Sequence, residues 1–415
     1  MNSYKAQKNN LRFNFFFYFF IFLSVQIPNI AYPASNNCDN AIFKIYKGKL
    51  AGAVDHVGKI KIDPKFESLK LGEQLSMALA SPPFPAKLPS GNFGYVDLNG
   101  SWIIQPNYEF ATTFKNGVAA VQDLKGKKFI INLKGEKMGE DWTDISLSDE
   151  GITTVVKGSK IFYLGSNGSM LFESPSDPLV PEVKDKNRLI SANDSFFFKF
   201  NEGLAPFRKK DHWGLINAKG KIVIIEQFDS VSIYRDFIVV SLGDRQGLVD
   251  RTGNYILNPS KVNIQCENVE NICSAQTLGT YDFKLFSVKK KKFLPGIYSD
   301  FKGCSEGLCI AIKQNGKGCD VWAPCPVAMD TEGRIVAYLP KASGFVTGFH
   351  DGFGSFSKFS DKQFTMGFFN KKGHVTISPQ FDDPVSEFAC GLALVSIGVN
   401  RGLINKKGEF VWNPQ

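Results

Sequence analysis

The stretch from Gly367 to Pro414 reads GFFNKKGHVTISPQFDDPVSEFACGLALVSIGVNRGLINKKGEFVWNP and contains one phrase twice. GFFNKKGHVTISP begins at Gly367, and GLINKKGEFVWNP begins 35 residues later, at Gly402. Self-similarity at a fixed spacing is typical of repeat architectures, in which each repeat is one supersecondary unit. We therefore expect the rest of the chain to be built from this phrase.

Each copy of the phrase predicts a β-hairpin. It runs from Gly through two or three apolar residues to Asp or Asn, two variable residues and a second Gly, and then to a strand-like run. In a type I turn, Asp or Asn at the first position caps the turn, and Gly at the fourth adopts the left-handed conformation. The Pro after the run lacks an N–H group, so we expect it to mark the end of the strand.

A second segment follows each hairpin and predicts a third strand. An aromatic residue lies two positions after the Pro, and a segment of the form Phe-x-x-Gly-Leu-Ala comes next, which we read as a turn leading into a strand. The aromatic residues are Phe66, Tyr108 and Phe381, and the clearest copies of the segment begin at Phe114, Phe200 and Phe388.

The repeats can be counted by the second Gly of the hairpin. It stands at Gly58, Gly100, Gly135, Gly168, Gly220, Gly253, Gly333, Gly373 and Gly408. The long interval from Gly253 to Gly333 has room for one degenerate unit, around residues 281–295. We predict an all-β protein of nine to ten tandem β-hairpin repeats that form a β-propeller-like or an open antiparallel array.

These repeats resemble those of the WG-repeat, or KWG-repeat, proteins of bacteria. HWGLINAKGKIVI at His212 carries the Trp213-Gly214 pair that names the family, and other copies have Phe93, Gln246, Met366 or Arg401 in place of the Trp. The resemblance covers nearly everything after about residue 41. It implies a β-rich repeat array, and it supplies no catalytic residues.

The N-terminus predicts export. Lys5, Lys8 and Arg12 precede an uncharged apolar run at residues 13–27, which is short for a membrane span of roughly 20 residues and typical of a secretory signal. We assign residues 1–34 to a signal peptide, with an uncleaved N-terminal anchor as the alternative, and residues 35–415 to the repeat region. Without those three basic residues the formal charge falls from +9 to +6. We expect a periplasmic or extracellular location.

Two irregular segments interrupt the repeats. Residues 172–196 read as an insertion, and insertions in repeat proteins form loops on one face, which is often the binding face. Residues 260–333 form a cysteine-rich segment. In an oxidising compartment its cysteines are expected in disulfides, because their spacing does not suit zinc. Cys304 with Cys309 and Cys319 with Cys325 are plausible local pairs, and a bond between Cys38 and Cys390 would close the array, but the connectivity stays open. The disulfide candidates are Cys38, Cys266, Cys273, Cys304, Cys309, Cys319, Cys325 and Cys390.

The sequence offers little chemistry. Its four His do not form a relay with nucleophiles or carboxylates, and it has no phosphate-binding Gly-x-x-x-x-Gly-Lys loop. The polar residues three positions before the repeat Gly could form a row that holds calcium or sugar hydroxyls, but Asp and Asn also suit the first position of a turn, which we prefer. The aromatic residues are expected in the core. The row consists of Asp55, Asp97, Asn132, Asn217, Asp250, Asp330, Asn370 and Asn405.

The function expected from the sequence is that of a non-catalytic exported repeat protein, a binding or scaffold module for a protein or glycan partner. We expect no catalytic residue, no metal, no cofactor and no nucleic-acid partner, and membrane contact only through an uncleaved N-terminal segment. The run Lys289 to Lys292 is read as a solvated loop. The alternative is an envelope enzyme, glycan-active, with its acids in the irregular segments at residues 177–194 or 320–330. Two carboxylates facing each other across a cleft, roughly 5 to 10 Å apart, would distinguish it.

Overall fold

The structure, a computed structural model, describes residue 38 and residues 41–71, 77–78, 82–177, 198–266, 270–280, 282–313, 325–342, 345–360, 363–382 and 385–414. The chain divides into two compact units, Met1–Ala31 and Tyr32–Gln415, and all described residues belong to the second. The predicted signal segment and residues 178–196 of the predicted insertion lie outside the described residues.

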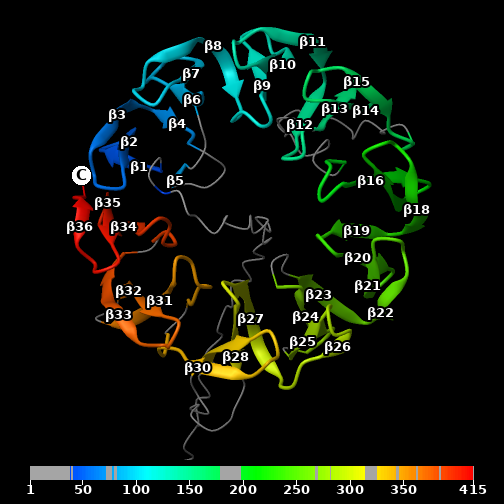
Figure 1. The fold of residues 1–415 in the computed structure, drawn as a ribbon, viewed down its shortest axis with the longest axis vertical. Coiled ribbons are helices and arrows are strands. Elements are labelled where there is room, and N and C mark those ends of the chain that lie inside the picture. The colour runs from blue at the N-terminus through cyan, green and yellow to red at the C-terminus, as the bar shows by residue number, and fades with distance from the viewer. Residues whose placement is uncertain are drawn as a thin grey trace, which may run out of the picture. The chain divides into compact units, whose positions relative to one another are not determined.

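Every regular element among the described residues is a β-strand, as predicted, and the strands form three-stranded antiparallel meanders (Figure 1). We number the meanders as units 1 to 10. Their strands are β1 (Ile42–Lys47), β2 (Leu50–Asp55) and β3 (Ile60–Phe66); β6 (Phe84–Lys87), β7 (Phe93–Val96) and β8 (Trp102–Ala111); β9 (Val118–Asp123), β10 (Lys128–Asn132) and β11 (Lys137–Trp142); β13 (Thr153–Lys157), β14 (Lys160–Leu164) and β15 (Met170–Glu173); β16 (Leu204–Lys209), β17 (His212–Asn217) and β18 (Ile222–Phe228); β20 (Phe237–Leu242), β21 (Arg245–Asp250) and β22 (Tyr255–Ser260); β24 (Ile272–Thr277), β25 (Phe283–Ser287) and β26 (Lys292–Phe293); β28 (Leu308–Lys313), β29 (Cys325–Asp330) and β30 (Ile335–Tyr338); β31 (Phe353–Ser360), β32 (Gln363–Asn370) and β33 (Val375–Phe381); and β34 (Leu392–Ile397), β35 (Asn400–Asn405) and β36 (Phe410–Trp412).

Six further strands each pair with the first strand of a unit. They are β4 (Ser68–Leu69), β5 (Met77–Ala78), β12 (Asp144–Leu147), β19 (Ser230–Ile233), β23 (Val262–Cys266) and β27 (Tyr298–Ser305). Apart from β5 and β27, each directly follows the third strand of the preceding unit. The backbone therefore passes from one unit into the sheet of the next. No helix in the described part of the chain is long and apolar enough to cross a membrane.

The prediction of nine to ten repeats is confirmed. The degenerate unit expected at residues 281–295 contains β25 and β26, and together with β24 it forms unit 7. Its second turn lacks the Asp/Asn-x-x-Gly sequence, which explains why the repeat is hard to recognise there.

The burial of the strands shows how the sheets stack. The first and second strands are buried at most positions, as in β20, where five of six residues are buried. The third strands alternate instead: β33 buries only Ile377 and Phe381. Strands that are buried on both faces lie between two packed layers. Each unit is therefore covered by neighbours on both faces of its first two strands, and its third strand lies at an edge of its sheet, except β8, which also pairs with β9.

Apolar clusters join consecutive units, and the last unit packs on the first. Ile42 on β1 packs with Phe84 of unit 2, whereas Phe43 on the same strand packs with Leu392 and Leu403 of unit 10. Figure 1 shows β34 to β36 in red beside β1 to β3 in blue. None of the described sheets closes into a barrel. The apolar clusters nevertheless connect the units in series, and the cluster of Phe43, Leu392 and Leu403 joins the last unit to the first.

The Pro of the phrase does not end its strand, which differs from the prediction. Pro64 lies inside β3 and Pro379 lies inside β33. The ladder between β2 and β3 shifts register between Ala51 and Ala53, next to the Pro. An edge strand tolerates Pro at such a bulge, because the missing N–H group would have had no ladder partner.

The same bulge explains the Gly of the Trp-Gly pair. A Cβ atom at Gly214 would lie 2.6 Å from the carbonyl oxygen of Ile224 and 2.5 Å from the ring of Phe207. The equivalent Gly in five other units would bring Cβ to within 2.5 to 2.8 Å of a backbone oxygen of the third strand; these are Gly52, Gly94, Gly247, Gly367 and Gly402. The third strand approaches the second too closely for any side chain there.

Candidate functional site

The row of Asp and Asn side chains, the most tempting candidate for a metal or sugar site, serves the backbone. Asp55 Oδ1 accepts hydrogen bonds from the N–H groups of Val57, at 3.1 Å, and Lys59, at 2.9 Å. The other seven members make the same two bonds to the residues two and four positions later. The repeat Gly that follows has a positive φ in every case, for example 85° at Gly58. The preferred turn interpretation is confirmed.

Donated hydrogen bonds also set the ionisation of these carboxyl groups. Partial burial would raise the pKa of Asp250, but hydrogen bonds from Thr252 and Asn254 outweigh it and lower the pKa to about 2. The pKa values of Asp55 and Asp330 are lowered in the same way, by backbone N–H groups that outweigh burial. A carboxylate held by several N–H donors stays ionised and is a poor proton donor. Among the described residues no group of three or more His, Cys, Asp or Glu could hold a metal ion.

A second set of turns precedes the first strand of each unit, and we call them leading turns. In five of them two consecutive residues have positive φ: Asn116-Gly117, Glu202-Gly203, Glu306-Gly307, Asp351-Gly352 and Cys390-Gly391. Two such residues define a type I′ turn, in which Gly is favoured at the second position. This is the turn that the Phe-x-x-Gly-Leu-Ala segment predicts.

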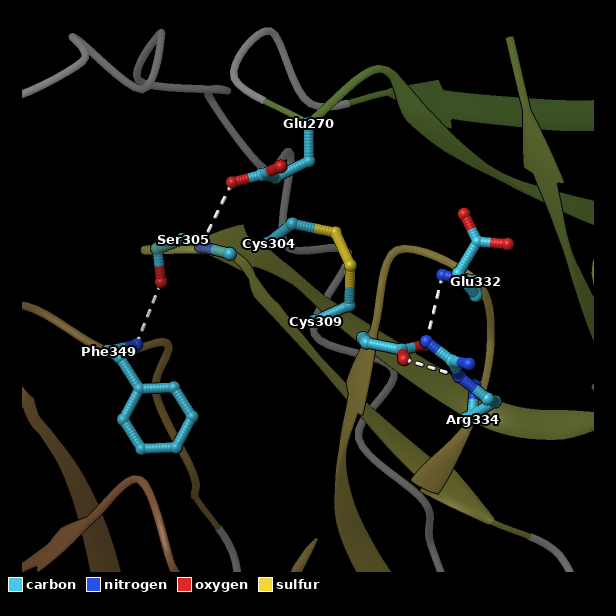
Figure 2. Close-up of a disulfide and its surroundings, with 9 residues drawn as sticks. Glu270, Cys304, Ser305, Cys309, Glu332, Arg334 and Phe349 are labelled. Atoms are coloured by element: carbon cyan, nitrogen blue, oxygen red, sulfur yellow. Dashed lines mark hydrogen bonds and ion pairs between the residues drawn. A yellow bond between two sulfur atoms is a disulfide. The ribbon is translucent and has the colours of Figure 1, made fainter. Parts of the chain in front are cut away.

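Carboxylates on the leading turns link neighbouring units. In four of these five turns the N–H group of the turn Gly donates to an acid on the leading turn of the preceding unit. Glu150 accepts from Gly203, at 2.9 Å, Glu270 from Gly307, at 3.0 Å, Glu306 from Gly352, at 3.0 Å, and Asp351 from Gly391, at 2.6 Å. Figure 2 shows the Glu270 carboxylate reaching the turn that joins Cys304 to Cys309. Each link satisfies a backbone donor with a charged acceptor.

Other side chains extend this chain of links in both directions. Asp236 accepts from the Asn271 amide, at 2.7 Å, and Lys115 pairs with Asp149, at 3.0 Å. Lysines on the Asp/Asn-x-x-Gly turns add a second layer: Lys406 Nζ lies 2.7 Å from Asp351, and Lys371 Nζ lies 3.0 Å from Glu306. The carboxylates of Glu150, Glu270, Glu306 and Asp351 therefore all form contacts between units.

Between units 10 and 1 a disulfide takes the place of the acid. Cys390 stands where Glu306 and Asp351 stand in their own turns, and it is bonded to Cys38, which is 352 residues away in sequence. The backbone links most other neighbouring units by running from one sheet into the next. At this junction the described residues show a covalent bond between side chains instead.

Four of the remaining cysteines also lie at leading turns. Cys266 is bonded to Cys273 and Cys304 to Cys309, and each pair is directly opposed across antiparallel strands at the base of a turn. Figure 2 shows Cys304–Cys309 beside Ser305, whose Oγ accepts the N–H of Phe349 in the next unit, at 2.8 Å. Cys325 is disulfide-bonded as well, and Cys319 lies outside the described residues. The three disulfides whose partners are both described thus reinforce the face that the acids hold together, whereas Cys325 lies at the other end of its sheet, opposite Lys313.

The other positions singled out in the sequence are dispersed. His56 and His374 are exposed, His212 Nε2 lies 3.7 Å from Asp229, and His350 Nε2 lies 3.0 Å from Glu387. The run from Lys289 to Lys292 is exposed, and Lys290 pairs with Glu332.

Two acids at the borders of the irregular segments have backbone roles. Asp177 accepts from the Lys210 N–H, at 2.8 Å, and Asp330 caps its turn. Residues 178–197, which follow Asp177, and residues 314–324 of the cysteine-rich segment lie outside the described residues. The described acids of these segments are therefore not brought together.

Aromatic side chains form much of the core, as predicted. Phe66, Phe228 and Phe381, at the fixed place after the bulge, are almost completely buried. Edge-to-face pairs such as Phe66 with Trp102, at 5.7 Å between centroids, fill the space between strands.

The linking acids were missed by sequence reasoning, although a signal was present. Glu306 and Asp351 each stand directly before a turn Gly, a position that the sequence predicts only to be part of a turn. An acid that recurs at a left-handed position, where Gly or Asn would be less strained, points to a use outside the turn. Chemically the arrangement can hold units in register.

The fold and this face together define an all-β, propeller-like array of linked meanders. The family described as WG containing repeat matches the chain at residues 93–128, 213–245 and 366–398, so the chain carries WG repeats, and the resemblance inferred from the sequence is confirmed. No curated protein matches the chain.

Similar solved structures are β-propellers. One, described as the eukaryotic initiation factor, is 10% identical, with a TM-score of 0.51 over 90% of this chain and 96% of that chain. BamB from Moraxella catarrhalis is 12% identical over 83% of this chain and 97% of its own, with a TM-score of 0.35. At such identities the first similarity shows the fold alone, and the second is too distant to carry an argument.

Proposed function

We propose that the protein is a non-catalytic, exported repeat module that binds a protein or glycan partner and acts as a scaffold. The observation that carries the proposal is the use of its repeated polar residues. The Asp and Asn row caps turns, and the acids of the leading turns hold neighbouring units together. Polar side chains that accept these backbone hydrogen bonds have a structural role, which supports a non-catalytic function.

Export is supported by the cysteines. Three disulfides are compatible with an oxidising compartment, because cytosolic thiols are normally kept reduced. The N-terminal sequence, with basic residues before an uncharged apolar run, is the second support. A bond such as Cys38–Cys390, which joins the two ends of the array, requires an oxidant to act after the whole chain has been made.

A bacterial host that expresses the whole chain with its own N-terminal segment tests export. We expect the protein in the periplasm or medium, with disulfide-linked peptides in mass spectra recorded without reduction. Free thiols at all eight cysteines and retention in the cytoplasm would contradict export.

Binding is tested separately, with the disulfide-intact protein on an array of cell-envelope glycans and by crosslinking to envelope proteins. We expect saturable binding with the glycan recovered unchanged. Release of a shortened glycan, abolished when one acid of residues 177–194 is replaced by its amide, would favour the enzyme alternative.

A further inference from the structure

The hairpins that join the first and second strands lie at the opposite end of the sheets from the leading turns, because neighbouring strands are antiparallel. We call their ends the tips. Asp382, after β33, clamps the tips of units 9 and 10 together: its carboxylate accepts from the Gln363 amide, at 2.6 Å, and from the N–H of Gly398, at 2.5 Å. The residues next to these donors are therefore held in fixed proximity.

Those residues are apolar and exposed. Phe359 and Phe364 are paired across the unit 9 hairpin, with ring centroids 4.8 Å apart, and they are 50% and 48% exposed. Ile397 and Val399 flank Gly398 in unit 10, and they are 46% and 97% exposed. A valine that makes almost no contact with its own chain adds nothing to folding. Two neighbouring tips that both carry such side chains indicate an external contact.

The same clamp elsewhere in the chain carries polar residues. Asp229, the counterpart of Asp382, accepts from the N–H of Gly243, at 2.5 Å, in the hairpin of unit 6. The residue after that Gly is Asp244, which pairs with Lys261, at 2.9 Å, whereas the residue after Gly398 is Val399. The clamp itself therefore does not require apolar tips.

Unpaired cations surround the apolar tips. Lys358, Arg401, Lys47 and Lys49 are exposed, and none forms an ion pair with a residue that the structure describes. Arg401 lies over the ring of Tyr46, 5.0 Å from its centroid, and so connects unit 10 to the tip of unit 1. At the tips of units 4, 5 and 6 at least one cation has an acid partner: Lys157 with Glu140, Arg208 with Asp211 and Lys261 with Asp244.

The local field at this junction is positive. Burial, together with the charges of Arg401 and Lys70, lowers the pKa of Lys44 on β1 to about 8. Lys44 has no ion pair among the described residues either. Exposed cations without acid partners attract anions.

We propose that the tips of units 9, 10 and 1 bind the surface of an anionic phospholipid bilayer. Phe359, Phe364, Ile397 and Val399 enter the interface, and Lys47, Lys49, Lys358 and Arg401 contact the headgroups. Apolar side chains framed by cations suit this environment. A bilayer fits better than a protein, because the side chains project and a lipid surface needs no complementary pocket. The contact is independent of the partner proposed for the rest of the array.

Flotation with vesicles of phosphatidylglycerol and phosphatidylcholine tests the proposal. The exported chain and its variants are compared with the same N-terminus, so any binding by that segment cancels. We expect Val399→Asp combined with Phe364→Ser to weaken binding about tenfold or more, and salt to weaken the wild type. Leu124→Asp, at the exposed tip of unit 3, is the matched control and leaves binding unchanged. Equal flotation of all variants, or equal binding to neutral vesicles, overturns the proposal.

A second measurement reports on the tips directly. A tryptophan is introduced by Val399→Trp or, as control, by Leu124→Trp, and quenching by brominated phosphatidylglycerol is recorded. We expect added quenching only for the substitution at 399, and the proposal fails if both positions respond alike. Self-association that Val399→Asp abolishes, without any vesicle binding, would make the tips an interface between copies and would also overturn it.

Discussion

The Cys38–Cys390 disulfide is predicted to supply more stability than any other described disulfide. We consider replacing both residues by serine. In the chain-entropy account, cross-linking restricts the unfolded state by an amount that grows with loop length. A sequence separation of 352 gives about 6 kcal/mol, whereas the separation of 5 for Cys304–Cys309 gives about 2 kcal/mol. The matched control is therefore the removal of Cys304–Cys309 by the same substitutions.

The effect should also be localised. Unit 10 meets unit 1 through the apolar cluster of Phe43, Leu392 and Leu403 and through this bond. Without the bond the two units can separate, and repeat arrays lose their terminal units first. Denaturant unfolding measures the loss of stability, and hydrogen exchange locates it. We expect faster exchange in β1 and β34 to β36, and unchanged protection in β20 and β21.

The reasoning would be refuted by two results. One is an equal loss of stability on removing Cys38–Cys390 and Cys304–Cys309, since the loop lengths differ so widely. The other is faster exchange spread evenly over all units, because the bond would then not act at the junction where it lies.

Three further substitutions follow from the geometry of single residues. Gly214→Ala should destabilise by about 1 to 3 kcal/mol, because its Cβ would overlap the Ile224 carbonyl oxygen; a neutral effect in thermal unfolding would contradict the close approach. Gly165→Asn should stabilise by up to about 1 kcal/mol, because it supplies an acceptor for the Asn167 N–H; the Ser169 N–H already has an acceptor in Asn167 Oδ1, at 3.0 Å. No change in the unfolding midpoint would count against the cap. Lys44→Met should stabilise at pH 7 by up to about 3 kcal/mol, since a pKa near 8 marks a penalty for the charged form. That penalty is full below pH 8 and disappears as the pH rises towards about 10.5, the unfolded value, so the gain from the substitution should vanish over the same range; a gain independent of pH would show that Lys44 is not penalised.

Much of the fold could be predicted from the phrase alone. An Asp at the first position of a turn binds N–H groups two and four residues later, and the Gly three residues later takes a positive φ. These interactions close within five residues, so residue types suffice to determine them. The strand borders are less local: Pro64 lies inside β3, because its strand has a neighbour on one side only.

The face held by acids depended on the tertiary structure. Glu150 and Gly203 are 53 residues apart, and the sequence does not say that their turns become neighbours. The chemical role of Gly214 was equally hidden, since it follows from how closely the third strand approaches the second. The sequence also does not show that the tips of units 9 and 10 are neighbours, because the Asp382 carboxylate brings them together through Gln363 and Gly398.

The sequence by itself determined the repeated hairpin, the all-β class and the structural use of Asp and Asn, because short-range hydrogen bonds and backbone preferences act within each repeat. The tertiary structure decided which units touch, that unit 10 returns to unit 1, and which side chains remain without partners. Contacts between units depend on how the ten units stack on one another, and that is a property of the whole array which no single repeat encodes.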